Sequence, residues 1–380
     1  MNAINILERI EDNGFEAYIV GGYVRDYLLG INSSDVDICT NARVRELLDI
    51  FSDYNVSSNE YGAVKLITND SRIDITTYRR DLKYNGSRRR VEIEYVDNLL
   101  DDINRRDFTM NTLCMNKEGN IIDVLNGKED IEKKIIRCVG NIDDRLNEDP
   151  LRMLRAVRFA TTLNFEIEEE LYKELKRNRT LIAQLSRERI KEELNKILTS
   201  TNALRGLKMM RNLGFLDYVG IDFNDNLVYV SDICGMYSQL TLKKEFPFSK
   251  EEKETIKAVK NILNYGIIDE NVIFTYGLYV SLVAGSILGV EREYITSLEK
   301  NLPIKRIKDI KISSDEICSI LNIKPNKIIH LVYDELKDLI LKGKLINDNN
   351  SIKEYLMVNR KKWLNEGASL EIVKCQEVGC

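Results

Sequence analysis

Proline, cysteine motifs and charge-free runs are scarce in this chain of 380 residues, and each scarcity excludes a class of protein. The seven cysteines lie scattered without a CxxC pair, so the sequence indicates neither a disulfide framework nor a zinc site. Only four prolines occur, and no Pro/Gly-rich linker is present. The opening stretch MNAINILERIEDNG lacks the cationic and apolar parts of a signal peptide and predicts a short amphipathic helix. We therefore expect a cytoplasmic protein.

One charge-free segment does occur, at residues 272–290 (VIFTYGLYVSLVAGSILGV). Its 19 residues are enough to span a bilayer. However, it includes three glycines, two serines and two tyrosines, and acidic residues rather than lysine or arginine flank it on both sides. These features favour a buried helix in a globular core, so we expect no membrane association.

The pattern of apolar residues changes once along the chain. Up to about residue 125, short β-rich runs such as DVDICT, AVKLIT and RIDITTYR alternate with helical stretches. Beyond about residue 145, nearly every segment has apolar residues three and four apart, as in LRMLRAVRFATTL. The sequence therefore predicts an α/β head followed by a long all-helical remainder.

Charge is unevenly distributed. The whole chain has a net charge of −5, but residues 301–363 carry 13 Lys and Arg against 8 Asp and Glu. A phosphate backbone requires such a local basic surface. A solvated face has the same composition, so both interpretations stay open at this point.

Two aspartates lie two positions apart in the strand-like run GINSSDVDICT. Side chains at i and i+2 of a strand point to the same face, so Asp35 and Asp37 can share one site. Carboxylates placed in this way can ligate hard divalent cations, and two such ions stabilise the attacking and leaving oxygens of a phosphoryl transfer. Turns and strand ends often contain the same pair without binding a metal.

The preceding run AYIVGGYVRDYLLG predicts a strand, a turn and a helix. Gly21 and Gly22 at the start of that helix would let backbone amides approach a triphosphate, although a tight turn explains them equally well. The Walker GK[ST] and the dinucleotide GxGxxG motifs are both absent. Arg25 could face phosphate or pair with Asp26 or Asp35.

At these residues the chain resembles a known family. The run GGYVRDYLLGINSSDVDICT is similar to the signature of class II tRNA nucleotidyltransferases and bacterial poly(A) polymerases, within the DNA polymerase β superfamily. Four further blocks follow in the family's order, namely a ribose-handling motif at 105–116, a head–neck hinge at 121–140, a base-reading motif at 148–160 and a neck helix at 186–198. The resemblance covers about residues 15–200.

The resemblance implies a division of the chain. We expect a nucleotidyltransferase head with a small mixed sheet and helices, then an all-α neck, body and tail. The ranges are 1–140 for the head, 141–215 for the neck, 216–310 for the body and 311–380 for the tail. Residues 313–356 resemble the tRNA-binding tail of bacterial CCA-adding enzymes, which favours tRNA as the substrate.

The same resemblance assigns roles in the head. It implies that Asp35 and Asp37 ligate metal and carry the chemistry, with Asp74 as a third carboxylate. The residues implied to contact the sugar and phosphates are Arg106, Asp107 and Asn111. The structural alternative is that Arg105 and Arg106 form a solvated pair and that Asp107 caps a helix.

The base-reading motif EDPLRMLRAVRFA places Asp149 and Arg152 three residues apart at a helix start. A carboxylate accepts from an exocyclic amine and a guanidinium donates to a ring acceptor, so the pair can accept CTP and ATP and refuse UTP and GTP. Arg155 and Arg158 follow on the same helix and are implied to bind the nucleotide. Alternatively, Pro150 is the first helical residue and Asp149 only its N-cap.

A segment at 77–96 resembles the flexible element that CC-adding members of the family lack. Its presence therefore argues for addition of A. The matching residues are Arg79, Asp81, Tyr84, Arg88 and Arg89, whereas Gly86 and Arg90 depart from the family pattern. A hairpin with a basic tip is the structural alternative.

Together these features predict a CCA-adding tRNA nucleotidyltransferase that uses two divalent ions, Mg²⁺, with CTP and ATP as substrates. The RNA 3′-hydroxyl attacks the α-phosphate, which needs no histidine and suits a chain whose only histidine is His330. The partner is tRNA, and no obligatory protein partner is inferred. The alternatives are an A-adding enzyme that works with a CC-adding partner, a poly(A) polymerase, and a non-catalytic RNA-binding protein.

Overall fold

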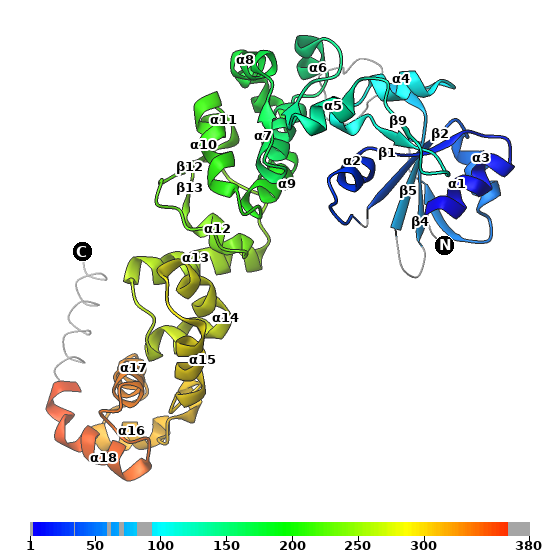
Figure 1. Cartoon of the computed structure of the whole chain (residues 1–380). Helices are drawn as coiled ribbons and strands as arrows, with labels where there is room; N and C mark the ends of the chain where they lie inside the picture. The colour runs from blue at the N-terminus through cyan, green and yellow to red at the C-terminus, as the bar shows by residue number, and fades with distance from the viewer. Residues whose placement is uncertain (1–2, 34, 59–61, 68–71, 82–92, 364–380) are drawn as a thin grey trace, which may run out of the picture. The chain divides into compact units, whose positions relative to one another are not determined.

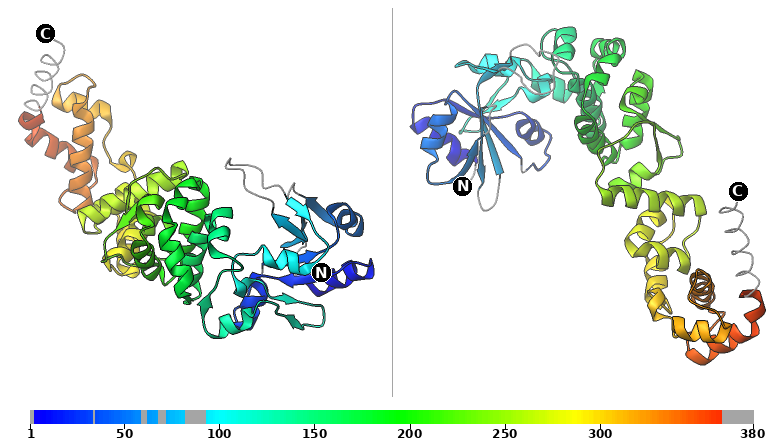
Figure 2. Two further views of the ribbon diagram at one scale, coloured as in Figure 1. Left: turned by 90° about the horizontal axis from the view of Figure 1, so that it is seen from above. Right: turned by 180° about the vertical axis from the view of Figure 1, so that it is seen from behind.

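Strands and helices alternate in the first part of the computed structural model, and helices dominate the rest (Figure 1). The structure describes residues 3–33, 35–58, 62–67, 72–81 and 93–363. The chain divides into two compact units, of which the first comprises residues 1–231 with 240–247 and the second 232–239 with 248–380. Figure 2 shows the strand-rich N-terminal part in blue and cyan and the helical part in green to red.

A seven-stranded sheet forms the centre of the head, in the order β3-β4-β5-β2-β1-β8-β9. Neighbouring strands are antiparallel except β2 and β5, which are parallel, so the predicted small mixed sheet is confirmed. The strands are β1 Ala17–Val20, β2 Val36–Thr40, β3 Asn55–Ser58, β4 Ala63–Ile67, β5 Arg72–Thr77, β8 Cys114–Met115 and β9 Ile121–Ile122.

The register of the central strands places the predicted metal ligands. Asp37 on β2 lies opposite Val20, the last residue of β1, and opposite Asp74 on β5. In β2 the exposed Asp37 is followed by three buried residues, which anchor the strand in the core. Helix α1 (Ala3–Asp12) packs on β1 and contributes the buried side chains of Ile6, Leu7 and Ile10. Asp37 is thus held at the start of a buried strand, beside the turn that follows β1.

The remaining head elements surround this sheet. A two-stranded antiparallel hairpin, β6 (Arg79–Asp81) with β7 (Ile93–Tyr95), forms the base of the segment predicted to be the flexible element. Tyr84, Arg88 and Arg89 lie outside the described residues, so the choice between flexible element and structural hairpin stays open. The helices are α2 Gly22–Leu28, α3 Val44–Ile50, α4 Leu99–Asn104, the 3-10 helix η1 Thr109–Asn111 and α5 Gly127–Glu132.

Helices α7, α9 and α10 pack together in the second half of the first unit. The helices of this part of the chain are α6 Ile142–Glu148, α7 Leu151–Thr162, α8 Glu169–Arg177, η2 Arg179–Gln184, α9 Arg187–Leu198, α10 Ala203–Leu213 and α11 Leu216–Val219. Two short two-stranded sheets also occur, one of β10 Ile135–Ile136 with β11 Glu166–Ile167 and one of β12 Ile221–Phe223 with β13 Leu240–Leu242. The remainder is therefore mostly helical, as expected, and the short strands β11, β12 and β13 lie among its helices.

The second unit is helical and contains two hydrophobic clusters, one around α13 to α15 and one around α16 to α18. Its elements are α12 Ile233–Ser238, α13 Lys250–Tyr265, α14 Glu270–Leu288, α15 Arg292–Asn301, η3 Ile307–Asp309, α16 Ser314–Leu321, α17 Ile328–Leu341 and α18 Asn349–Val358. The predicted boundaries at 140, 215 and 310 stay a prediction.

Helix α14 contains the charge-free segment. Within the part of the chain that the structure describes, it is the one helix long and apolar enough to cross a bilayer by length and composition. It packs against α13 and α15, where Val272, Ile273, Val283 and Ala284 enter the hydrophobic cluster. Only 33% of its most apolar stretch is buried, so the expected core helix is present but is less buried than the sequence suggested.

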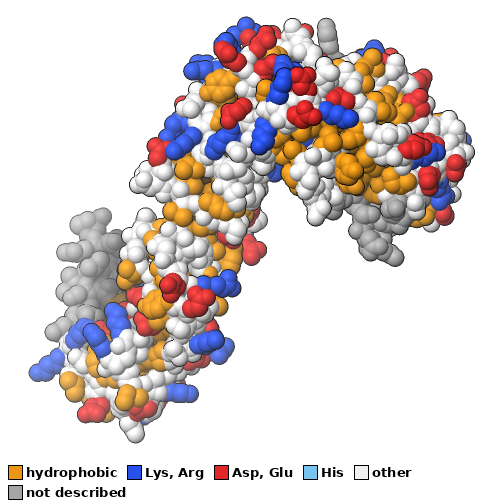
Figure 3. Space-filling model, in the orientation of Figure 1, with side chains coloured by type: hydrophobic (Ala, Val, Ile, Leu, Met, Phe, Trp, Pro, Cys, Tyr) orange, Lys and Arg blue, Asp and Glu red, His pale blue; other side chains and the backbone are white. Residues whose placement is uncertain are grey.

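Basic residues of 301–363 are partly paired with acids. Lys305 lies 2.7 Å from Glu299, and Lys353 lies 2.7 Å from Glu316. Figure 3 shows Lys and Arg side chains interspersed with Asp and Glu on the face in view. The surface is therefore of mixed charge, and its role in RNA binding stays a prediction.

Gly206 on α10 allows the close packing of α10 on α7 and α9. A Cβ atom at this position would lie 2.3 Å from Thr161 Oγ1 and 2.9 Å from Ile197 Cγ2. We expect Gly206→Ala to lower the free energy of unfolding by about 1–3 kcal/mol, because the core must shift to admit a methyl group. Urea unfolding measures this, with Lys208→Ala on the exposed face of the same helix as a control expected to stay within about 0.5 kcal/mol of wild type.

Candidate active site

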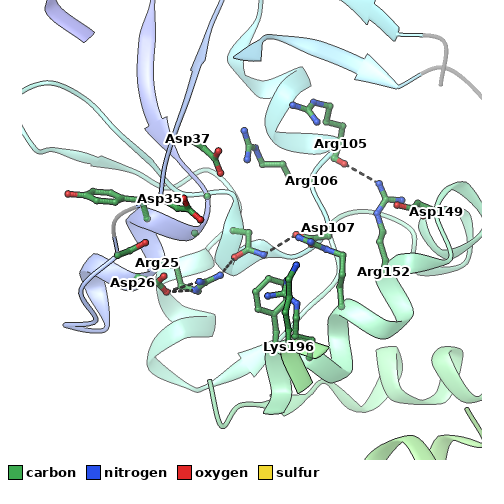
Figure 4. Close-up of a pocket in the computed structure, with 18 residues that line it drawn as sticks. Arg25, Asp26, Asp35, Asp37, Arg105, Arg106, Asp107, Asp149, Arg152 and Lys196 are labelled. Atoms are coloured by element: carbon green, nitrogen blue, oxygen red, sulfur yellow. Dashed lines mark hydrogen bonds and ion pairs between the residues drawn. The ribbon is translucent and has the colours of Figure 1, made fainter. Parts of the chain in front are cut away.

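A cavity of about 570 Å³ opens in the first unit, where β1 ends and where β2 and α2 begin (Figure 4). All of the residues predicted to bind metal or nucleotide line it, with the exception of Asp74. The lining residues are Gly21, Gly22, Tyr23, Arg25, Asp26, Ser33, Asp35, Asp37, Arg105, Arg106, Asp107, Asn111, Asp149, Arg152, Arg155, Arg158, Phe159 and Lys196. Residues more than a hundred positions apart in sequence thus meet at one site.

Two carboxylates lie on one side of the cavity, and both are open to it. Asp35 immediately precedes β2 and Asp37 is its second residue. Desolvation raises the pKa of the Asp37 carboxyl, Arg106 opposes this shift, and the negative charges of Asp74 and Asp35 add to it. A cation between the carboxylates would relieve that repulsion. Their oxygen atoms are ligands that Mg²⁺ prefers.

The donor set also limits what could bind. No group of three His, Cys, Asp or Glu residues that could hold a metal occurs among the residues that the structure describes. Mg²⁺ is commonly bound by one or two carboxylates together with water and substrate phosphates, and Asp35 and Asp37 fit this pattern. Asp74 lies beside Asp37 in the sheet, but its carboxylate is 3.6 Å from Lys65 Nζ and it does not line the cavity. Its role as a third carboxylate therefore stays a prediction.

The turn between β1 and α2 depends on Gly21. This residue has φ 78° and ψ −129°, a conformation that glycine adopts without steric cost. A Cβ atom at this position would also lie 3.4 Å from Arg106 Nη1. The turn thus brings the backbone close to a predicted nucleotide-binding side chain, and the approach of Gly21 and Gly22 to a triphosphate stays a prediction.

Arg25 is buried and begins a chain of hydrogen bonds across the floor of the cavity. Of the two pairings predicted for it, the structure contains the one with Asp26, at 2.6 Å. Its Nη1 donates to Asn111 Oδ1 (2.6 Å), and Asn111 Nδ2 donates to Asp107 Oδ1 (3.0 Å). Arg155 Nη2 then lies 2.5 Å from Asp107 Oδ2. This chain joins α2, η1 and α7.

Asp107 stays ionised in this chain. Burial raises the pKa of its carboxyl, but the charge of Arg155 and the hydrogen bond from Asn111 outweigh burial, and the net shift is downward. The alternative that Asp107 caps a helix was wrong, because its oxygens accept from Asn111, from Arg155 and from the neighbouring Phe108 N–H. The alternative of a solvated Arg105–Arg106 pair was also wrong, because both guanidinium groups bind the buried Asp102.

The base-reading motif lies where α6 meets α7. Asp149 Oδ1 accepts from the Leu151 N–H (3.1 Å), and Oδ2 accepts from Arg189 Nη2 (2.9 Å). The first is a capping contact, but α7 begins at Leu151 with Pro150 as its N-cap, one residue later than the predicted start at Pro150. Arg152 donates to the Arg145 carbonyl (2.6 Å), to Glu148 Oε2 (3.0 Å) and to the Arg105 carbonyl (3.2 Å). Both side chains line the cavity, so capping and base reading by Asp149 are compatible.

Several residues of the site were not predicted. Phe159 lies under three guanidinium groups, those of Arg158, Arg25 and Arg155, at 3.8, 5.1 and 5.3 Å from its ring centre. The buried Glu193 accepts from Arg158 Nε (2.7 Å) and from Lys196 Nζ (3.2 Å). These contacts hold the cationic wall of the cavity in place.

A sequence signal existed for part of this set. Arg189, Glu193 and Lys196 recur at i, i+4 and i+7 in SRERIKEELNKIL, which places them on one face of α9. Asp102 on α4 precedes Arg105 and Arg106, which follow the end of this helix, by three and four residues, the spacing of an ion pair. No local signal marks Phe159, whose spacing is that of an ordinary core residue.

The head fold and the carboxylate-lined cavity define a nucleotidyltransferase. The family model for the poly A polymerase head domain matches residues 17–137, and a model described as a probable RNA and SrmB-binding site of polymerase A matches residues 164–222. The CCA-adding enzyme of Ligilactobacillus salivarius is 32% identical over 96% of each chain, and that of Staphylococcus aureus (strain MRSA252) is 31% identical over 92% of this chain and 96% of its own.

A solved structure agrees over the whole chain. The Bacillus stearothermophilus CCA-adding enzyme in complex with CTP matches with a TM-score of 0.82 and 25% identity, over 96% of this chain and 98% of that one. The chain belongs to the CCA-adding enzyme family.

Asp149→Asn separates capping from base reading. The amide keeps the acceptor for the Leu151 N–H, so we expect the free energy of unfolding to fall by less than about 1 kcal/mol. Nucleotide choice should relax toward UTP, because an amide can donate to a carbonyl oxygen. Competition between CTP and UTP in primer extension measures this.

Asp143→Asn is the matched control for that variant. Asp143 lies 2.8 Å from Arg177, also in the first unit, and does not line the cavity. It should lose an exposed ion pair and keep full selectivity. If Asp149→Asn is as selective as this control, Asp149 is a cap and an ion-pair partner only.

Proposed function

We propose that this chain is a template-independent CCA-adding tRNA nucleotidyltransferase, which adds C, C and A to the 3′ end of tRNA from CTP and ATP. One observation carries the proposal. Asp35 and Asp37, whose carboxylates suit phosphoryl transfer, line the same cavity as Asp149 and Arg152. The carboxylate of Asp149 and the guanidinium of Arg152 suit recognition of cytosine and adenine. The relatives over nearly the whole chain are CCA-adding enzymes, which supports the same assignment.

Asp35 and Asp37 are the residues that would hold two Mg²⁺ ions. When bound, the ions would neutralise the charge that develops on the α-phosphate and activate the RNA 3′-hydroxyl. The two carboxylates would place the ions at the start of β2. No histidine or nucleophilic side chain is needed for this transfer.

Cationic side chains would position the triphosphate and sugar. Arg25, Arg106, Arg155 and Arg158 all line the cavity, and each already has at least one carboxylate or amide partner that fixes its direction. Preorganised donors of this kind cost little reorganisation when the substrate binds. Asp107, held ionised in the hydrogen-bond chain, would accept a hydrogen bond from the ribose.

Base selection would follow from Asp149 and Arg152. An ionised carboxylate accepts from the exocyclic amine of cytosine or adenine, and a guanidinium donates to the adjacent ring acceptor. Uracil and guanine present a carbonyl oxygen where the amine is required, so a carboxylate would repel them. We infer that tRNA, CTP and ATP reach the enzyme in the cytoplasm.

The poly A polymerase head model leaves a second activity to be tested, because its match covers the catalytic part of the chain. Purified protein is given tRNA ending at the discriminator base, at C or at CC, with labelled CTP, ATP or both. With CTP and ATP together, we expect these three tRNAs to be extended by three, two and one nucleotides respectively, and we expect no extension when UTP or GTP is supplied instead. Extension of the CC-ending tRNA alone would instead indicate an A-adding enzyme, and a long A tail would indicate a poly(A) polymerase.

Replacing Asp35 or Asp37 by Ala should abolish incorporation of both CTP and ATP, because neither ion can then be held. Affinity for tRNA, measured by filter binding, should stay within about twofold, since phosphate contacts are spread over the chain. Asp53→Ala, which removes a head carboxylate paired with Arg9 at 2.5 Å, is the control and should keep full activity. Turnover of the double variant within tenfold of wild type would contradict the two-metal proposal.

A further inference from the structure

Asp102 on α4 is the most buried carboxylate beside the cavity, with 0% of its surface exposed. Its Oδ1 accepts from Arg105 Nε (2.8 Å), and its Oδ2 accepts from Arg106 Nη2 (3.0 Å). Each oxygen therefore binds a different guanidinium group, and these two hydrogen bonds fix the orientation of both guanidinium groups. Asp102 itself does not line the cavity, whereas both arginines do.

The same carboxylate is tied to the hairpin. Oδ1 also accepts from the backbone N–H of Arg79, the first residue of β6 (3.3 Å). The neighbouring Asp101 binds Arg80 of the same strand at 2.9 Å. Helix α4 is thus bonded to the base of the hairpin, and the Asp102 side chain contacts both this strand and the two arginines that line the cavity.

The backbone that follows α4 receives the base-reading side chain. Arg152 Nη2 donates to the Arg105 carbonyl (3.2 Å), and Arg145 Nη2 donates to the Arg106 carbonyl (2.7 Å). The position of the Arg152 side chain therefore depends on the backbone of the two arginines that Asp102 binds. A shift of this backbone would move the Arg152 guanidinium, which would face the base in the proposed function.

The charges of this cluster depend on one another. Burial raises the pKa of the Asp102 carboxyl, but Arg106 and Arg105 outweigh burial, and the net shift is downward. Burial opposes the charged form of Arg106, and Asp102 reverses this and raises the pKa of the guanidinium. Removing one partner of such a buried pair leaves the other charge uncompensated, so the geometry is strongly enforced.

We propose that Asp102 is a positioning residue for nucleotide selection. It fixes Arg106, and through the Arg105 carbonyl it fixes Arg152, without touching the nucleotide. This inference rests on the proposed function and adds a residue outside the cavity to its specificity. The hairpin β6–β7 shares the same anchor, so its base and the nucleotide site are held by one carboxylate.

The test uses Asp102→Asn in the full chain, with steady-state extension of tRNA by CTP and ATP. We expect the KM for both nucleotides to rise at least fivefold and discrimination against UTP and GTP to fall at least tenfold. The KM for tRNA should change less than twofold. A merely structural role would lower the melting temperature and the active fraction, and hence kcat, without moving the nucleotide KM or the discrimination.

Asp101→Asn is the matched control, because it removes the adjacent carboxylate on the same helix and its contact with Arg80, but leaves Arg105 and Arg106 bound. It should stay within twofold of wild type in every constant. Asp102→Glu keeps the charge and decides the question if Asp102→Asn does not fold. It should fold and still show a raised nucleotide KM, because the longer side chain displaces both guanidinium groups.

Either variant, folded and with wild-type nucleotide KM and discrimination, would overturn the inference. A rise in the KM for tRNA alone would overturn it as well, because Asp102 would then act on the RNA. Failure of the proposed function looks different, since wild type itself would then not extend tRNA with CTP and ATP.

Discussion

The hydrogen-bond chain Arg25–Asn111–Asp107–Arg155 is the interaction on which the cavity depends. It connects the helix after the glycine turn to the helix that carries the base-reading residues. Because its members are largely enclosed, the loss of one would leave a buried charge or amide without its partner, which costs more than the bond itself contributes. Polar contacts, and not apolar packing alone, therefore set the distance between the metal side and the base side of the site.

Much of this site could be predicted because each motif is local. The spacing of a strand predicts that Asp35 and Asp37 share one face. A turn between strand and helix explains Gly21, which has a positive φ. The spacing of Asp149 and Arg152 predicts that they share one site, and the structure places both in the cavity. The α/β head and the mostly helical remainder follow from the change of apolar period near residue 145.

The parts that sequence could not predict are contacts between distant segments. Arg189 lies forty positions from Asp149, and Arg152 lies forty-seven positions from the Arg105 carbonyl. No periodicity encodes such pairs, because they arise only when the helices pack. The short strands β10 and β11 have two residues each, too few for an alternating pattern to appear. The sequence gives no sign of the role that we propose for Asp102 for a related reason, since this role passes through other side chains.

Helix α7 fixes the distances between three side chains that would bind the nucleotide. Arg152, Arg155 and Arg158 lie at intervals of three residues, so each step advances about 4.5 Å along the axis and turns the side chain back by about 60°. This single helix therefore sets the spacing between the groups that would contact the base and those that would contact the phosphates. A one-residue insertion within this helix would rotate everything beyond it by about 100°, so its length is far less tolerant of change than its composition.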